Sequence, residues 1–149
     1  MATIDYHGVM TSLKAIFEAD SLTSGVPVFI EEEPAFDAYN SAGKAIIIVF
    51  DGRQAPAQIQ PIAAGKRVRL HARYGVWSVG FGLSYEAAAS RRDDLMGAVD
   101  LVLANNRTVS GKLSHSWIEG GVCVPVQASQ GLAALAETVL IGEAVAIAT

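Results

Sequence analysis

The side chains of this chain that are able to bind a metal or act as nucleophiles are few and scattered. They are His7, His71, His115 and the single cysteine, Cys123. A metal site needs several such ligands at short spacing. His115 and Cys123 lie in two neighbouring predicted strands, where a lone pair of this kind is more often a packing contact than a pair of ligands. We therefore expect no metal site.

The sequence does not indicate acid–base or nucleophilic chemistry either. Glu31, Glu32 and Glu33 are adjacent at the end of a predicted strand, so their carboxylates face alternate sides, which is poor geometry for an acid–base pair. No serine stands in a G-x-S-x-G turn, and Gly80-Phe81-Gly82 lacks the third glycine of a phosphate-binding loop. We expect no catalytic residue, no cofactor and no enzymatic activity.

A row of cations is the most distinctive charged feature of the sequence. Between Lys66 and Tyr74, apolar residues alternate with Arg67, Arg69, His71 and Arg73. A strand places such residues on one face, roughly 7 Å apart. Three interpretations follow, in this order: a solvated sheet face, a contact with Glu31, Glu32 and Glu33 of a neighbouring subunit, and a contact with DNA phosphate. The contact with DNA is last because the whole chain is acidic.

The composition is that of a folded, acidic protein. The 149 residues suit one domain, residues 1–149, and 51% of them are hydrophobic while 17% are charged. The formal net charge of −4 gives no general attraction to nucleic acid or to anionic membranes. The longest apolar run, Ala45–Phe50, is far shorter than the roughly 20 residues of a membrane span, so we expect no membrane association.

Two further features of the composition bear on compartment and assembly. Residues Met1–Asp5 lack the basic region and apolar core of a signal peptide, and a lone cysteine agrees with a reducing compartment, so we expect the cytoplasm. Charge is low while Ala, Val, Ile and Gly are plentiful. This balance leaves apolar surface for another subunit to cover and indicates oligomerisation.

The elements that must position these residues are organised around the stretch from Trp77 to Asn106. In Trp77–Leu83, apolar residues alternate with Gly or Ser, which is typical of a strand with one buried face. Ser84 is a predicted helix N-cap, and Glu86 lies in the first turn, where a carboxylate is favourable. The apolar face of the helix that follows contains Leu95, Val99, Val102 and Leu103.

The rest of the chain predicts a further helix and several strands. A helix is expected over Asp5–Glu18, an edge strand over Val26–Ile30, and a central strand over Ala45–Phe50. The expected connections are a long loop over Asp51–Gly65, a hairpin turn at Glu119-Gly120-Gly121 and a small-residue link over Ser129–Ala136. A terminal strand is expected over Glu137–Thr149.

One segment is ambiguous. At Gly75 the apolar positions change from even to odd numbers, so a bulge or bend there would bring Trp77, Val79, Phe81 and Leu83 onto the core face. The alternation does not distinguish one bent strand over residues 66–83 from a hairpin. The predicted class is α+β, with a mixed or antiparallel sheet flanked by an N-terminal helix and one long central helix.

This order of elements resembles the tail terminator, or tail completion, proteins of long-tailed bacteriophages such as lambda. The likeness is carried by Val26–Glu32, Ala45–Phe50, Trp77–Leu103 and Glu137–Ala148. It is a likeness of layout, and it supplies no site residues. The resemblance implies a ring of identical subunits, six by the model of that family, which caps the tail tube, meets the head connector and leaves a bore through which DNA passes. It also implies a place in the virion, after assembly in the host cytoplasm.

Two other classes of function stay open at this point. One is a different head–tail connector or neck component of a virion. The other is an enzyme or small-ligand domain with a pocket under the Asp51–Gly65 loop, lined by His71, Tyr74 and Trp77.

Overall fold

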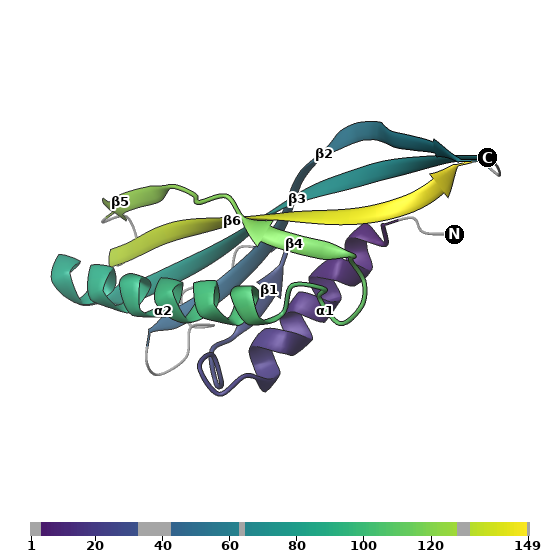
Figure 1. Ribbon diagram of the computed structural model, residues 1–149. Coiled ribbons are helices and arrows are strands. Elements are labelled where there is room, and N and C mark those ends of the chain that lie inside the picture. Colours follow the sequence, from purple (N-terminus) through teal and green to yellow (C-terminus); the bar gives the residue numbers. More distant parts are fainter. Residues whose placement is uncertain (1–3, 33–42, 63–64, 128–131, 149) are drawn as a thin grey trace.

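The computed structural model describes residues 4–32, 43–62, 65–127 and 132–148. Within these residues the chain forms two helices and a six-stranded sheet (Figure 1). In chain order the elements are α1 (Tyr6–Ala19), β1 (Val28–Ile30), β2 (Lys44–Ile62), β3 (Gly65–Gly82), α2 (Tyr85–Asn105), β4 (His115–Ile118), β5 (Cys123–Gln127) and β6 (Leu132–Ala148).

The sheet is mixed, and its strand order is β1-β2-β3-β6-β4, with β5 also paired to β6. The β1–β2 pair is parallel, and every other pair is antiparallel. The expected α+β class is confirmed, and so are the edge position of β1 and the interior position of the Ala45–Phe50 run within β2.

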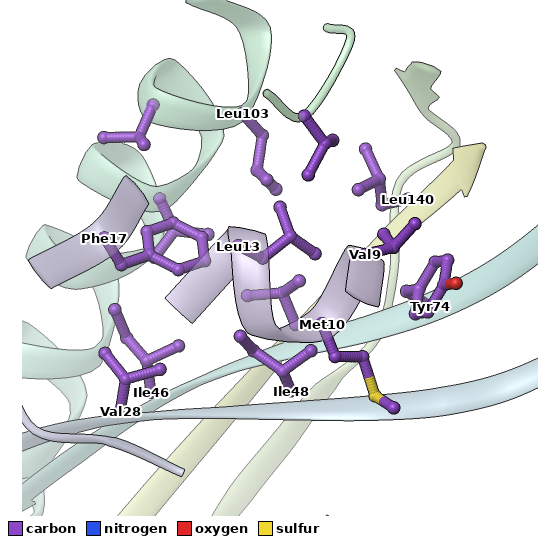
Figure 2. Packing of buried hydrophobic residues seen from close by; sticks show 14 of the residues in the cluster. Val9, Met10, Leu13, Phe17, Val28, Ile46, Ile48, Tyr74, Leu103 and Leu140 are labelled. Atoms are coloured by element: carbon purple, nitrogen blue, oxygen red, sulfur yellow. The ribbon is translucent and has the colours of Figure 1, made fainter. Parts of the chain in front are cut away.

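Both helices lie on one face of the sheet, and the core is between them and the strands (Figure 1). α1 contributes Val9, Met10, Leu13 and Phe17, which meet Ile46 and Ile48 of β2 (Figure 2). α2 contributes Ala88, Leu95, Val99, Val102 and Leu103. The apolar stripe predicted for the second helix, Leu95, Val99, Val102 and Leu103, is therefore a buried stripe.

The helix ends follow ordinary capping chemistry. Asp5 accepts a hydrogen bond from the Gly8 N–H at 3.0 Å, and Ser84 accepts one from the Ala87 N–H at 3.1 Å. The predicted N-cap role of Ser84 is confirmed. A partly buried polar contact also joins α2 to the sheet, because the Thr138 hydroxyl donates to Asp100 at 2.7 Å.

The expected change of facing at Gly75 is wrong. β3 is one strand whose register with β6 is unbroken from Lys66 to Gly82, and the irregularities lie in β2 instead. The even-numbered residues of β3 from Leu70 to Gly82 therefore lie on the helix side of the sheet. The reason is close packing. A Cβ at Gly80 would stand 2.2 Å from the Ala88 carbonyl oxygen, so α2 can pack this closely on β3 only because the strand has a glycine there.

As a result, the apolar residues of Trp77–Leu83 do not join the core between the helices and the sheet. Trp77 and Val79 lie on the opposite face, and Leu83 is 99% exposed.

The loop expected over Asp51–Gly65 is also wrong for the residues that the structure describes there. β2 continues to Ile62 and pairs with β3 back to Gly65, with register shifts at Phe50/Gly52, Gln54/Ala57 and Gln58/Gln60. Pro56 and Pro61 suggested a loop, but β1 pairs with β2 only as far as Ile48. Beyond that point β2 is an edge of the described sheet, where a residue without an N–H is tolerated.

The hairpin expected around Gly120 does not form. β4 and β5 both pair with β6, at Ile118↔Leu140 and Cys123↔Ala136, and not with each other. The residues between them keep bonding to β6, since Glu119 N–H donates to the Val139 carbonyl and Val139 N–H to the Gly120 carbonyl. Gly120 has a φ of 94°, and this bend in the backbone allows β4 and β5 both to pair with β6.

The expected terminal strand is present as β6, but it starts at Leu132 rather than Glu137. Residues 132–136 of the expected small-residue link therefore belong to the strand. Neither helix among the described residues is long and apolar enough to span a bilayer.

Candidate functional site

The face of the sheet opposite the helices is the surface that remains for function, and we call it the open face. Neither described helix lies on it (Figure 1). Cross-strand pairs identify its residues: Trp77 is paired with Ile47 on one side and Glu137 on the other, and Arg73 is paired with Ile141. Paired residues project to the same side of a sheet, so the open face crosses β2, β3 and β6.

One half of the open face is an apolar groove. It has a volume of about 470 Å³, and its lining residues are Ile47, Val49, Trp77, Val79, Val124, Ala133 and Leu135, with Glu31 and Glu32 at its border. Of the apolar lining residues, only Val79 is fully buried. Strands from three parts of the chain thus form a continuous apolar surface that is in contact with solvent.

The other half of the open face is charged. Glu143 accepts from His71 Nε2 at 2.9 Å and lies 3.2 Å from Arg69 Nε, while Arg73 Nε lies 2.9 Å from Asp51. Asp51 reaches Arg73 because β2 has an extra residue between Phe50 and Gly52, and such bulges redirect side chains. His71 also packs edge-on against Trp117, with ring centroids 5.8 Å apart.

This arrangement bears on the cation row predicted from the sequence. Arg69, His71 and Arg73 do share one face, and they are paired with carboxylates of their own chain. Arg67 belongs to β3, but its side chain lies outside the described residues. The row is therefore at least partly a compensated sheet face rather than a bare row of donors.

The acidic residues predicted to contact the cation row of a neighbouring subunit directly follow the last residue of β1. Glu31 and Glu32 are exposed, and Glu33 lies outside the described residues. Glu31 accepts from the Phe50 N–H at 2.7 Å and has a φ of 56°, so its backbone is already turned out of the strand. Among the described residues, Glu31 and Glu32 border the apolar groove and make no ion pair with Arg69 or Arg73 of the same chain.

Glu137 is the titratable group of the open face whose environment is unusual. It is paired with Trp77 between the two halves of the face. Burial raises the pKa of its carboxyl, the Asp51 carboxylate raises it further, and Arg73 opposes both effects. A carboxylate here is therefore costly for the folded chain at neutral pH.

The three residues considered for an enzyme or small-ligand pocket do not lie together. Tyr74 is fully buried on the helix side, where its hydroxyl donates to the Tyr6 carbonyl, while His71 and Trp77 are on the open face. His115 and Cys123 are paired to β6 seven residues apart, at Glu143 and Ala136, which separates them by roughly 23 Å. In the part of the chain that the structure describes, no group of three or more His, Cys, Asp or Glu side chains is placed to hold a metal.

Sequence reasoning missed the groove, although a signal for it exists. Alternation alone predicts that the apolar residues at odd positions from Trp77 to Phe81 face the core and that Gly80 lies on a bare, exposed face. In the structure Gly80 is the position on which the helix backbone packs, so the odd positions face away from the helices. Small residues opposite a long helix are as consistent with close helix packing as with exposure.

Comparison with known proteins finds no matching family model and no matching curated protein. Among solved structures, the chain is similar to a chain described as belonging to the virion of a native gene transfer agent particle. The two share 11% sequence identity with a TM-score of 0.44, over 97% of this chain and 100% of that chain. A match at this level is a likeness to a virion chain and does not by itself identify a function.

Proposed function

We propose that this protein is a structural protein of a phage-type virion, a tail terminator whose copies close into a ring over the end of the tail tube. The observation that supports the proposal is the open face, with its apolar groove and charged half on a sheet that carries helices on its other side. The protein acts by assembly and not by catalysis.

The physical argument concerns what covers the open face. A sheet is stable in water when each apolar surface is buried against another layer. Here α1 and α2 form one such layer, and the groove on the other side has none among the described elements. Burial of apolar surface contributes roughly 25 cal/mol per Å², so a complex in which a protein partner covers this face is stabilised by the contact.

The layout of the chain gives the proposal its specific form. A helix, a short edge strand ending in acidic residues, an apolar strand, and a strand that leads directly into one long helix are the features that resemble tail terminators. We propose a ring of six, with the tail tube protein on one side, the head–tail connector on the other and DNA passing through the bore. The chain is made in the host cytoplasm and works in the virion.

Native mass spectrometry and negative-stain imaging of the purified protein, alone and with tail tube protein, test this function. The expected result is a closed ring, alone or on the tube end. A protein that stays monomeric under both conditions contradicts the proposal. A ring that binds the connector and leaves the tube end free supports the neck-component alternative instead.

A further inference from the structure

The apolar groove of the open face has carboxylates around it and no cation within it. Glu31 and Glu32 stand exposed at its border, and Glu137 lies beside Trp77, which lines it. None of the described residues that line the groove is a lysine, arginine or histidine. A protein surface that suits the groove therefore presents an apolar side chain with a cation beside it, because complementary charges orient a contact.

The described part of this chain has five large apolar side chains that are exposed: Leu22, Leu83, Tyr85, Leu101 and Val122. Two of them lie beside acidic groups, which the acidic border of the groove would repel. The Asp20 carboxylate accepts from the Leu22 N–H at 2.9 Å, and the exposed Glu86 follows Tyr85. Leu101, which is 51% exposed, has a different neighbourhood.

Leu101 lies on the outer side of α2, close to a cation. Ala104 is one turn further along, and the exposed Arg107 donates from Nε to the Ala104 carbonyl at 3.3 Å. Arg107 takes part in none of the ion pairs formed by the described residues. Asp100 is turned toward the sheet, where it accepts from the Thr138 hydroxyl. We call Leu101, Ala104 and Arg107 the knob of α2.

The knob cannot reach the groove of its own chain. α2 packs on the face of the sheet opposite the groove, and Val99 and Val102 are on its buried side (Figure 1). The sheet itself therefore separates the knob from the groove. A contact between these two surfaces must join two copies of the chain.

We infer that the apolar groove of one copy receives the α2 knob of the next copy. This inference rests on the proposed ring and names its subunit contact. The helix layer of one copy then covers the open sheet face of its neighbour, so that both faces of each sheet are buried. Because groove and knob are different surfaces, the contact is head-to-tail, and such contacts close into a ring when the rotation between copies allows it.

Substitution of the knob leucine tests the apolar part of the contact. Leu101→Ser is expected to raise the concentration needed for ring formation by about tenfold or more, as for a side chain at the centre of an interface. Leu22→Ser is the matched control, because Leu22 is also 51% exposed, and it should leave ring formation unchanged. Both variants should unfold in urea as the wild type does. Equal ring formation by Leu101→Ser and the wild type overturns the inference.

Charge reversal tests the polar part. Glu32→Arg puts a cation at the groove, and Arg107→Glu puts an anion on the knob. Each variant alone is expected to lose ring formation, because like charges then meet in every contact. Mixing the two variants should restore rings in which the two kinds of subunit alternate. Failure of the mixture to recover any rings overturns the pairing of Glu32 with Arg107.

Crosslinking tests the geometry. Cys123 is exposed and precedes Val124, which lines the groove. With Ala104→Cys in the knob, a short bis-maleimide is expected to give a ladder of covalent dimers, trimers and larger species, since every copy offers both ends. Adding Cys123→Ser should abolish the ladder. An equal ladder from Ala15→Cys, at an exposed position of α1, would contradict the assignment.

The outcomes separate this inference from the proposed function. Rings that persist in Leu101→Ser and in both charge variants overturn the groove–knob contact and leave the ring proposal standing. A wild-type protein that forms no ring, alone or with tail tube protein, overturns the proposed function itself. Recovery of rings by mixing supports both.

Discussion

At the scale of single residues, two leucines with similar sequence patterns lie in opposite environments. Leu83, directly after β3, is 99% exposed, whereas Leu95 of α2 is 2% exposed in the core. Both were expected in the buried set from their spacing. Spacing alone identifies residues that share a face, and it does not say which face is covered.

The substitution Leu83→Ser is expected to change the free energy of unfolding by less than about 0.5 kcal/mol, because the side chain makes no buried contact. Leu95→Ala is the matched core variant and should cost about 2–5 kcal/mol. Urea unfolding of the two variants measures the difference. If Leu83→Ser lowered the free energy of unfolding by as much as Leu95→Ala, the Leu83 side chain would have to be covered in the folded protein.

Glu137 provides a prediction about pH. Its pKa in the folded chain is raised above the ordinary value of 4.5, so the folded state binds the proton more tightly than the unfolded state. Stability linked to this group is present below pH 4.5 and is lost as the pH rises through the folded value. Glu137→Gln should therefore raise the melting temperature at pH 7.

The gain from Glu137→Gln should disappear as the pH is lowered below 4.5, which thermal unfolding at a series of pH values will show. Asp94→Asn, on the exposed side of α2, serves as the control and should have little effect. A gain from Glu137→Gln that is the same at all pH values would point to a packing effect instead.

At the scale of elements, glycine decides how α2 sits on the sheet. Gly80 allows the helix backbone to approach β3, and any Cβ there would meet the Ala88 oxygen and the Arg92 nitrogen, both at 2.2 Å. Gly97, within α2, has open space around its Cβ position. The same residue type therefore has opposite roles in the two neighbouring elements.

We expect Gly80→Ala to destabilise the fold by about 1–3 kcal/mol, because the helix backbone must move away. Gly97→Ala should stabilise it by about 0.5–1 kcal/mol, since alanine loses less entropy in a helix. Equilibrium unfolding with circular dichroism checks both signs. Equal effects of the two variants would show that α2 does not rest on Gly80.

Elements with a strong local signal were predictable from the sequence, and elements set by pairing were not. The Ser84 cap and the Leu95–Leu103 stripe need only local spacing, and they appear where expected. The Asp51–Gly65 segment resembled a loop because of Pro56 and Pro61, but its prolines occupy a sheet edge. The groove depends on strands that meet from distant parts of the chain, and no local pattern reports which of them are neighbours.

At the scale of the whole molecule, the charged half of the open face contains ion pairs within one chain, and we propose that it also takes part in assembly. Arg69 and Arg73 are about half exposed in their ion pairs, with 44% and 47% of their side-chain surface accessible. Exposed pairs contribute roughly 0–1 kcal/mol each to stability. A larger effect of these residues on assembly would therefore place them in a subunit contact.

The double variant Arg69→Glu and Arg73→Glu is expected to lower monomer stability modestly and to weaken ring formation more strongly. Unfolding of the monomer and native mass spectrometry of the ring measure the two effects separately. Ring formation equal to that of the wild type would remove these arginines from the contact and leave them as a solvated sheet face.

The unbroken course of β3 has a consequence for the number of subunits. One strand joins the groove at Trp77 to the far end of the sheet at Lys66, so a rotation of about 5° at the groove displaces that far end by roughly 3 Å over the length between them. The direction in which a copy presents that end is then set by the twist of β2, β3 and β6. In the ring that we propose, small changes in that twist would select the number of copies that complete the circle.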